Sequence, residues 1–113
     1  MAVQMRTVVY PVDDLAAAKA FYTRLLGVEP HTDQPYYVGY SVDGTEIGLD
    51  PHGHAQGHTG AVAYWDVDDL EAAVASLVEA GGKVLVPARE VGGGMSVATV
   101  TDADGNLVGL RSS

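Results

Sequence analysis

Two stretches of the chain share one pattern of apolar and polar positions. In each, a run of β-branched and aromatic residues, at 7–12 and again at 61–67, is followed by an alanine-rich run with apolar residues at helical spacing. The same four letters, Val-Asp-Asp-Leu, stand at both transitions, at 12–15 and 67–70. The pattern predicts a duplicated strand and helix, in which one aspartate of each pair caps the helix.

The segments that follow each helix are predicted to be strands. Glycine ends both helical runs, at Gly27 and at Gly81-Gly82, and Asp-Gly pairs at 43–44 and 104–105 predict tight turns between strands. We predict a short strand that runs into a loop within 28–34, strands at 36–42, 45–49, 83–87, 95–101 and 106–110, and a flexible loop at 89–94.

The spacing between equivalent residues supports the duplication and locates its main irregularity. Asp14 and Asp69 are 55 positions apart, whereas Gly48 and Gly109 are 61 apart. The second copy therefore has six additional residues after its helix, and the glycine loop at 92–94 is the natural place for them. We expect one domain over 1–113, with a first module at about 1–50, a linker at 51–59 and a second module at about 60–113.

Composition and charge narrow the classes of partner. The chain has 113 residues and no cysteine, which excludes disulfides and thiol chemistry. Fifteen acidic against six basic residues give a net charge of −9, which disfavours nucleic acids and anionic membranes and would suit a cationic small molecule. No secretion signal or long apolar run is present, so we expect a cytoplasmic protein.

The combination of motifs resembles the vicinal oxygen chelate superfamily, the group of glyoxalases, bleomycin-resistance proteins and extradiol dioxygenases. The resemblance rests on the repeated Val-x-Asp-Leu helix starts, on Phe21-Tyr22 followed by Leu26-Gly27, and on the segment 102–106 before the last strand. It implies an α+β fold of two tandem βαβββ modules, whose curved mixed sheet surrounds a cleft and whose helices lie outside. It also implies a homodimer.

In the metalloenzymes of that group, four strand positions that face the cleft carry His or Glu as metal ligands. In this sequence the corresponding positions are Thr7, Gly48, Val62 and Gly109. None can supply an imidazole or a carboxylate, and a register shift of one residue offers no better ligand. The resemblance to members that bind without a metal predicts no cofactor and leaves an enzymatic activity doubtful, with no catalytic residue assigned.

Strand parity predicts which other residues face the cleft. Tyr64 and Asp66 share a face with Val62, and Glu46 shares one with Gly48. For the strand at 36–42 we favour Val38, Tyr40 and Val42 as core, which places Tyr37 in the cleft; the opposite face would expose Tyr36 and Tyr40. The strand at 95–101 offers a similar choice that the sequence leaves open. The predicted cleft residues are Thr7, Tyr37, Glu46, Gly48, Val62, Tyr64, Asp66 and Gly109.

The linker carries the alternative metal ligands. Asp50, His52, His54 and His58 are suited to a divalent transition metal. Gly53 and Gly57 make a loose, solvated linker the favoured interpretation, because metal ligands need fixed orientations.

The expected function is that of a metal-independent small-molecule binding protein of the glyoxalase and bleomycin-resistance type, which sequesters a drug or metabolite. The alternative is a metal-dependent lyase, isomerase or dioxygenase with non-standard ligands. A third interpretation is an interaction module with an empty cleft.

Overall fold

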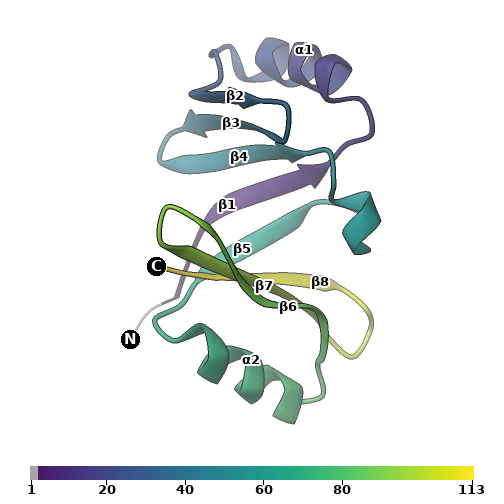
Figure 1. Cartoon of the computed structure of the whole chain (residues 1–113), viewed down its shortest axis with the longest axis vertical. Helices are drawn as coiled ribbons and strands as arrows, with labels where there is room; N and C mark the ends of the chain where they lie inside the picture. Colours follow the sequence, from purple (N-terminus) through teal and green to yellow (C-terminus); the bar gives the residue numbers. More distant parts are fainter. Residues whose placement is uncertain (1–2) are drawn as a thin grey trace. The chain divides into compact units, whose positions relative to one another are not determined.

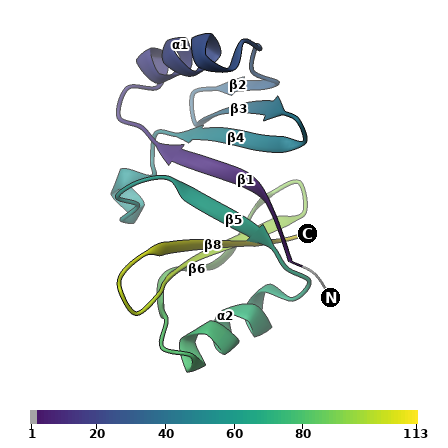
Figure 2. The same ribbon diagram turned by 180° about the vertical axis from the view of Figure 1, so that it is seen from behind.

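The computed structural model describes residues 3–113, which form two compact units. The N-terminal unit is Arg6–Val62, and the C-terminal unit is Ala63–Ser113 together with residues 3–5. Each unit has one α-helix that packs against one face of its strands (Figures 1 and 2). No helix of the described residues is long and apolar enough to cross a membrane.

The N-terminal unit has the strand order β2-β3-β4-β1. β1 runs parallel to β4, whereas the β2–β3 and β3–β4 pairs are antiparallel. The turn between β3 and β4 is made by Asp43 and Gly44, both with positive φ, as a two-residue hairpin requires. The elements are β1 (Gln4–Pro11), α1 (Leu15–Leu26), β2 (Thr32–Gln34), β3 (Tyr37–Val42), β4 (Thr45–Asp50) and the short 3₁₀ helix η1 (His54–Gln56).

The core of this unit lies between α1 and the sheet. Val38, Tyr40 and Leu49 are fully buried there, against the apolar stripe of the helix. The Tyr40 hydroxyl donates to the carbonyl oxygen of Lys19 at 3.1 Å, so the buried phenol keeps a polar partner. The favoured face of the strand at 36–42 is confirmed: Val38 and Tyr40 belong to the core, and Tyr37 lies on the other side of the sheet.

The C-terminal unit repeats this plan with the strand order β5-β8-β7-β6. Its buried centre lies between the helix and the strands, where Leu70 of the helix is clustered with Ala98 and Leu110. Because Ala98 faces the helix, Met95, Val97 and Thr99 lie on the opposite face, which settles the choice that the sequence left open. The elements are β5 (Val62–Asp66), α2 (Leu70–Glu79), β6 (Lys83–Gly92), β7 (Met95–Thr101) and β8 (Leu107–Ser112).

The two helix starts have the same hydrogen bond. Asp14 Oδ1 accepts from the backbone N–H of Ala17 at 3.0 Å, and Asp69 Oδ1 accepts from that of Ala72 at 3.1 Å. Each bond satisfies a backbone donor that the first helical turn would leave without a partner. The second aspartate of each pair is therefore the cap, and the aspartates serve the same structural role in both units.

The long hairpin of the C-terminal unit corrects the prediction of a strand at 83–87 and a flexible loop at 89–94. β6 continues to Gly92 and pairs with β7, and only Gly93 and Gly94 remain in the turn. The ladder shifts register at several points, one of them between Val86 and Arg89, where Pro87 has no N–H to donate. The extra residues thus lengthen a bulged hairpin.

The segment predicted as a loose linker is folded. η1 lies within it, and Gly57 ends that turn with a φ of 92°. His58 is buried, with only 3% of its surface exposed. A Cβ at Gly53 would lie 2.6 Å from the Cβ of Pro11, so only glycine fits this approach. The two glycines that suggested looseness allow a compact turn instead.

Candidate functional site

The face of the N-terminal sheet that α1 does not cover is dominated by Tyr37. Its ring lies over Gly39 and Gly48, which are paired across β3 and β4. A Cβ at Gly39 would come within 2.8 Å of the ring, and one at Gly48 within 2.7 Å of ring atom Cε1. Glu46 and Thr7, which are paired across β4 and β1, lie on the same face. The predicted residues of this unit other than Val62 thus share one surface.

Glu46 holds a chain of hydrogen bonds on this surface. Its Oε2 accepts from the Tyr37 hydroxyl at 2.7 Å, and its Oε1 lies 2.6 Å from Nε2 of His31. The Thr32 hydroxyl lies 2.8 Å from the other ring nitrogen of His31. Each carboxylate oxygen of Glu46 therefore has a partner, which fixes the carboxylate and the phenol in place.

Sequence reasoning missed His31. It precedes β2, and the backbone bond from its N–H to the carbonyl of Gly39, at 2.9 Å, places it beside β3. The chain carried no local signal for this contact, because it depends on how a three-residue strand pairs with its neighbour.

In the C-terminal unit, Tyr64 covers the glycine of the closing strand, as Tyr37 does in the first unit. Tyr64 of β5 pairs with Gly109 of β8, and a Cβ at Gly109 would lie 2.6 Å from Cδ2 of the tyrosine ring. Only 9% of Tyr64 is exposed. Thr99 pairs with Gly109 from the other side and is buried. Both closing-strand glycines are therefore covered by a tyrosine ring. Val62, the first residue of β5, is fully buried.

Asp66 and Arg111 lie further along the same two strands, in register with each other. The Arg111 Nε atom is 3.7 Å from Asp66 Oδ1, which is longer than a hydrogen bond. That carboxylate oxygen is buried and has no hydrogen-bond partner among the described residues. The two side chains border a pocket of about 300 Å³, which is also lined by Gln4, Val67, Asp68, Met95, Ser112 and Ser113.

The four positions that the resemblance assigns to metal ligands do not fit a metal ion. Thr7 and Val62 are buried and offer no imidazole or carboxylate. At Gly48 and Gly109 a side chain would collide with Tyr37 and Tyr64, so the tyrosine rings occupy the space that a ligand would need. The missing donor groups at Thr7 and Val62 and the occupied space at Gly48 and Gly109 thus both argue against a metal ion at these four positions.

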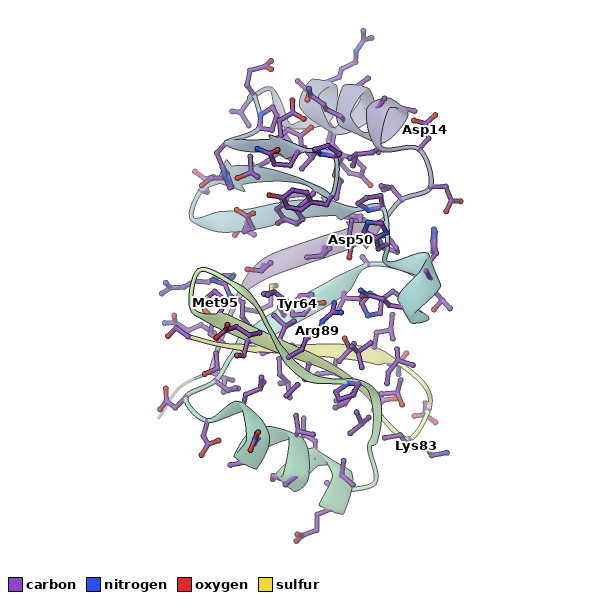
Figure 3. The ribbon with its side chains drawn as sticks, in the orientation of Figure 1. Asp14, Asp50, Tyr64, Lys83, Arg89 and Met95 are labelled. Carbon is purple, nitrogen blue, oxygen red and sulfur yellow. The ribbon has the colours of Figure 1, made fainter. Side chains whose placement is uncertain are left out.

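The alternative ligand set in the linker is not brought together either. His54 Nδ1 lies 2.7 Å from Asp13 Oδ1, and the backbone N–H of His52 donates to Asp50 Oδ1 at 2.8 Å. Asp50 stands at the end of β4 (Figure 3), and His58 is buried. Among residues 3–113, no three His, Cys, Asp or Glu side chains form a group that could hold a metal ion.

Comparison with known proteins gives the family. A family model described as Glyoxalase/Bleomycin resistance protein/Dioxygenase superfamily matches residues 4–110. The chain is 31% identical over 107 residues to a protein of Mycobacterium bovis that carries the name glyoxylase CFP32; the match includes 86% of this chain and 41% of that protein. The chain thus spans less than half the length of this relative.

Solved structures have the same fold. A member of the superfamily from Vibrio splendidus has a TM-score of 0.71 and 18% identity, with 98% of each chain covered. The Mn(II)-bound glyoxalase from Novosphingobium aromaticivorans has a TM-score of 0.68 and 24% identity, with 96% of this chain and 38% of the other covered. The match over nearly the whole sequence shows that the chain belongs to the glyoxalase, bleomycin resistance protein and dioxygenase superfamily.

Proposed function

We propose that this protein binds a small organic molecule without a metal ion. The observation that carries the proposal is the tyrosine over each closing-strand glycine, Tyr37 over Gly48 and Tyr64 over Gly109. In both units an aromatic ring takes the place of a metal ligand, and the ring of Tyr37, which is partly exposed, is a surface on which an organic molecule can stack.

The carboxylates beside these rings favour a cationic ligand. Glu46 lies next to Tyr37, and Asp66 lies two residues beyond Tyr64 on the same face of β5. The net charge of −9 acts in the same direction at longer range. The role in the cell would be sequestration of a drug or metabolite, and the resemblance to the family supports a homodimer as the binding species.

A thermal-shift screen tests the binding proposal. Cationic aromatic drugs and small amines should include compounds that raise the melting temperature, because a ligand at a hundred times its Kd adds about 2.7 kcal/mol to the free energy of unfolding. Tyr37→Leu and Tyr64→Leu should reduce that rise more than Tyr36→Leu, which changes an exposed tyrosine outside these surfaces. A library in which no compound stabilises the protein would contradict the proposal.

A metal titration separates this proposal from a metal-dependent lyase, isomerase or dioxygenase, an activity of the kind that the names of CFP32 and the Novosphingobium protein suggest. Protein purified without an affinity tag should contain no stoichiometric transition metal. Added Mn²⁺, Ni²⁺, Zn²⁺ or Fe²⁺ should leave its melting temperature unchanged. A bound equivalent of metal, lost in a His52→Ala or His54→Ala variant, would favour the enzyme.

A further inference from the structure

The pocket beside Asp66 and Arg111 combines opposite charges with an apolar wall. It lies where β5 and β8 end and β7 begins, and its volume of about 300 Å³ is at the small end of the range for ligand sites. Asp66 supplies a carboxylate, Arg111 a guanidinium group and Met95 an apolar side chain. The lining thus offers a different partner for each part of a small amphipathic molecule.

Asp66 and Arg111 form an ion pair in which Asp66 Oδ1 accepts no hydrogen bond from the described residues. Arg111 Nε and Asp66 Oδ1 are 3.7 Å apart, too far for a hydrogen bond. A buried carboxylate oxygen without a donor is unfavourable. Oδ1 itself is buried, but 37% of the Asp66 side chain is exposed, so a donor that arrives with a ligand can reach the rest of this carboxylate.

We propose that this pocket binds a small zwitterion that carries an ammonium group and a carboxylate, such as an α-amino acid. The ammonium group donates to Asp66, the carboxylate accepts from Arg111, and an apolar side chain contacts Met95. Gln4 and Ser112 can add neutral hydrogen bonds. The inference rests on the proposed small-molecule binding and names the class of ligand for Asp66.

Charge balance distinguishes a zwitterion from a simple ion. A lone cation would be attracted by Asp66 and repelled by Arg111, and a lone anion would meet the reverse. Asp68, which also lines the pocket, adds a second negative charge that opposes an anion further. A molecule with both charges gains from Asp66 and Arg111 together.

Three compounds with one carbon skeleton test this proposal. Leucine carries both charges, 3-methylbutylamine lacks the carboxylate and 4-methylpentanoate lacks the amine. In an NMR titration of the ¹⁵N-labelled protein, leucine should shift the amide signals of Asp66, Met95 and Arg111 and bind at least about tenfold more tightly than either half. Equal affinity for the amine and for leucine would overturn the zwitterion in favour of a cation site.

Two variants and a matched control assign the roles. Asp66→Asn should weaken leucine and the amine, whereas Arg111→Gln should weaken leucine and 4-methylpentanoate. Glu29→Gln removes an exposed carboxylate of the N-terminal unit that lies in neither proposed site, and should leave leucine binding unchanged. Leucine affinity that survives both Asp66→Asn and Arg111→Gln, or no shift of these signals with leucine, would overturn the inference. If library compounds still stabilise the protein in that case, the proposed function stands without it.

Discussion

The two units share a helix cap and a tyrosine-covered glycine, but they differ in the hydrogen bonding of a nearby carboxylate, Glu46 in the first and Asp66 in the second. Both begin a helix with an Asp cap, and both cover the glycine of their closing strand with a tyrosine ring. In the N-terminal unit both carboxylate oxygens of Glu46 have partners, His31 and Tyr37. In the C-terminal unit one oxygen of Asp66 is buried without a hydrogen bond. The first carboxylate is held in place, and the second can still accept a donor.

The tyrosines show that this likeness is not a simple copy. Tyr37 belongs to β3 and covers Gly48 from the neighbouring antiparallel strand, whereas Tyr64 belongs to β5 and covers Gly109 from a parallel strand. The same space is filled from strands that are not equivalent in the duplication. Both units therefore fill this space, while the polar groups around it differ.

The largest effect is expected where the covering ring is most deeply buried and has the least room to move. Gly109→Ala should lower the free energy of unfolding by about 1–3 kcal/mol, because its Cβ would lie 2.6 Å from a Tyr64 ring atom and that residue is 9% exposed. Gly48→Ala should cost less, under about 1 kcal/mol, because Tyr37 is only partly buried and can move outward. Urea unfolding followed by circular dichroism measures both.

A double variant tests whether the Tyr64 ring causes the cost of Gly109→Ala. In a Tyr64→Ala background, Gly109→Ala should lose most of its cost, because the colliding atoms are gone. Equal costs for Gly48→Ala and Gly109→Ala in the wild-type background would show that the two rings are equally confined, against the comparison.

Removing either helix cap, in contrast, should lower the free energy of unfolding by the same amount. Asp14→Ala and Asp69→Ala should each cost about 1 kcal/mol, because each removes one side-chain acceptor for a backbone N–H of the first turn. Asp68→Ala, at the neighbouring acid, is the control and should change the free energy of unfolding by less than about 0.5 kcal/mol. A cap variant that costs no more than this control would contradict the shared role.

Much of the fold could be predicted because its signals are local. The two helices follow from apolar spacing and from caps, and the turn at Asp43-Gly44 follows from two adjacent residues that tolerate positive φ. Strand parity then placed Tyr37 and Glu46 on one face. These inferences needed only contacts between near neighbours and one decision about which face is buried.

The features that sequence reasoning missed depend on distant contacts. His31 reaches Glu46 only because β2 pairs with β3. The glycines near His54 suggest flexibility in the sequence, whereas in the structure Gly53 packs closely on Pro11. The length of β6 depends on bulges that absorb Pro87. Composition alone does not distinguish a glycine that loosens a loop from one that permits close packing.

The turn before β8 gives a smaller, pH-dependent difference between the units. Hydrogen bonds from the side chain and backbone of Asn106, with a further backbone bond from Asp104, hold the pKa of Asp102 below its ordinary value. Because the folded-state pKa is lowered, this contribution is present above the unfolded pKa and is lost as pH falls through the folded one. NMR titration of its side-chain carboxyl carbon should show a higher pKa in an Asn106→Ala variant, still below the ordinary value because the backbone bonds of residues 104 and 106 remain; an unchanged pKa would contradict the contribution of the Asn106 side chain.

The smallest effect should come from Asp66, whose Oδ1 accepts no hydrogen bond from the described residues, and this result would separate the two units most clearly. Glu46→Gln should cost about 0.5–1 kcal/mol, because it weakens a charge-assisted bond with Tyr37 and the contact with His31, both partly exposed. Asp66→Asn should change the free energy of unfolding by less than about 0.5 kcal/mol, because Asp66 Oδ1 has no hydrogen bond to lose and Arg111 lies 3.7 Å away.

The same Asp66→Asn variant should still lose affinity for leucine, and that combination is what a binding residue predicts: little cost to the fold and a clear cost to the ligand. A residue that serves only the fold would show the reverse. If Asp66→Asn destabilised the protein as much as Glu46→Gln, the Asp66–Arg111 contact would be a structural ion pair like that of Glu46 and His31. Both carboxylates would then stabilise the fold, and the proposal that the pocket beside Asp66 binds a ligand would lose its support.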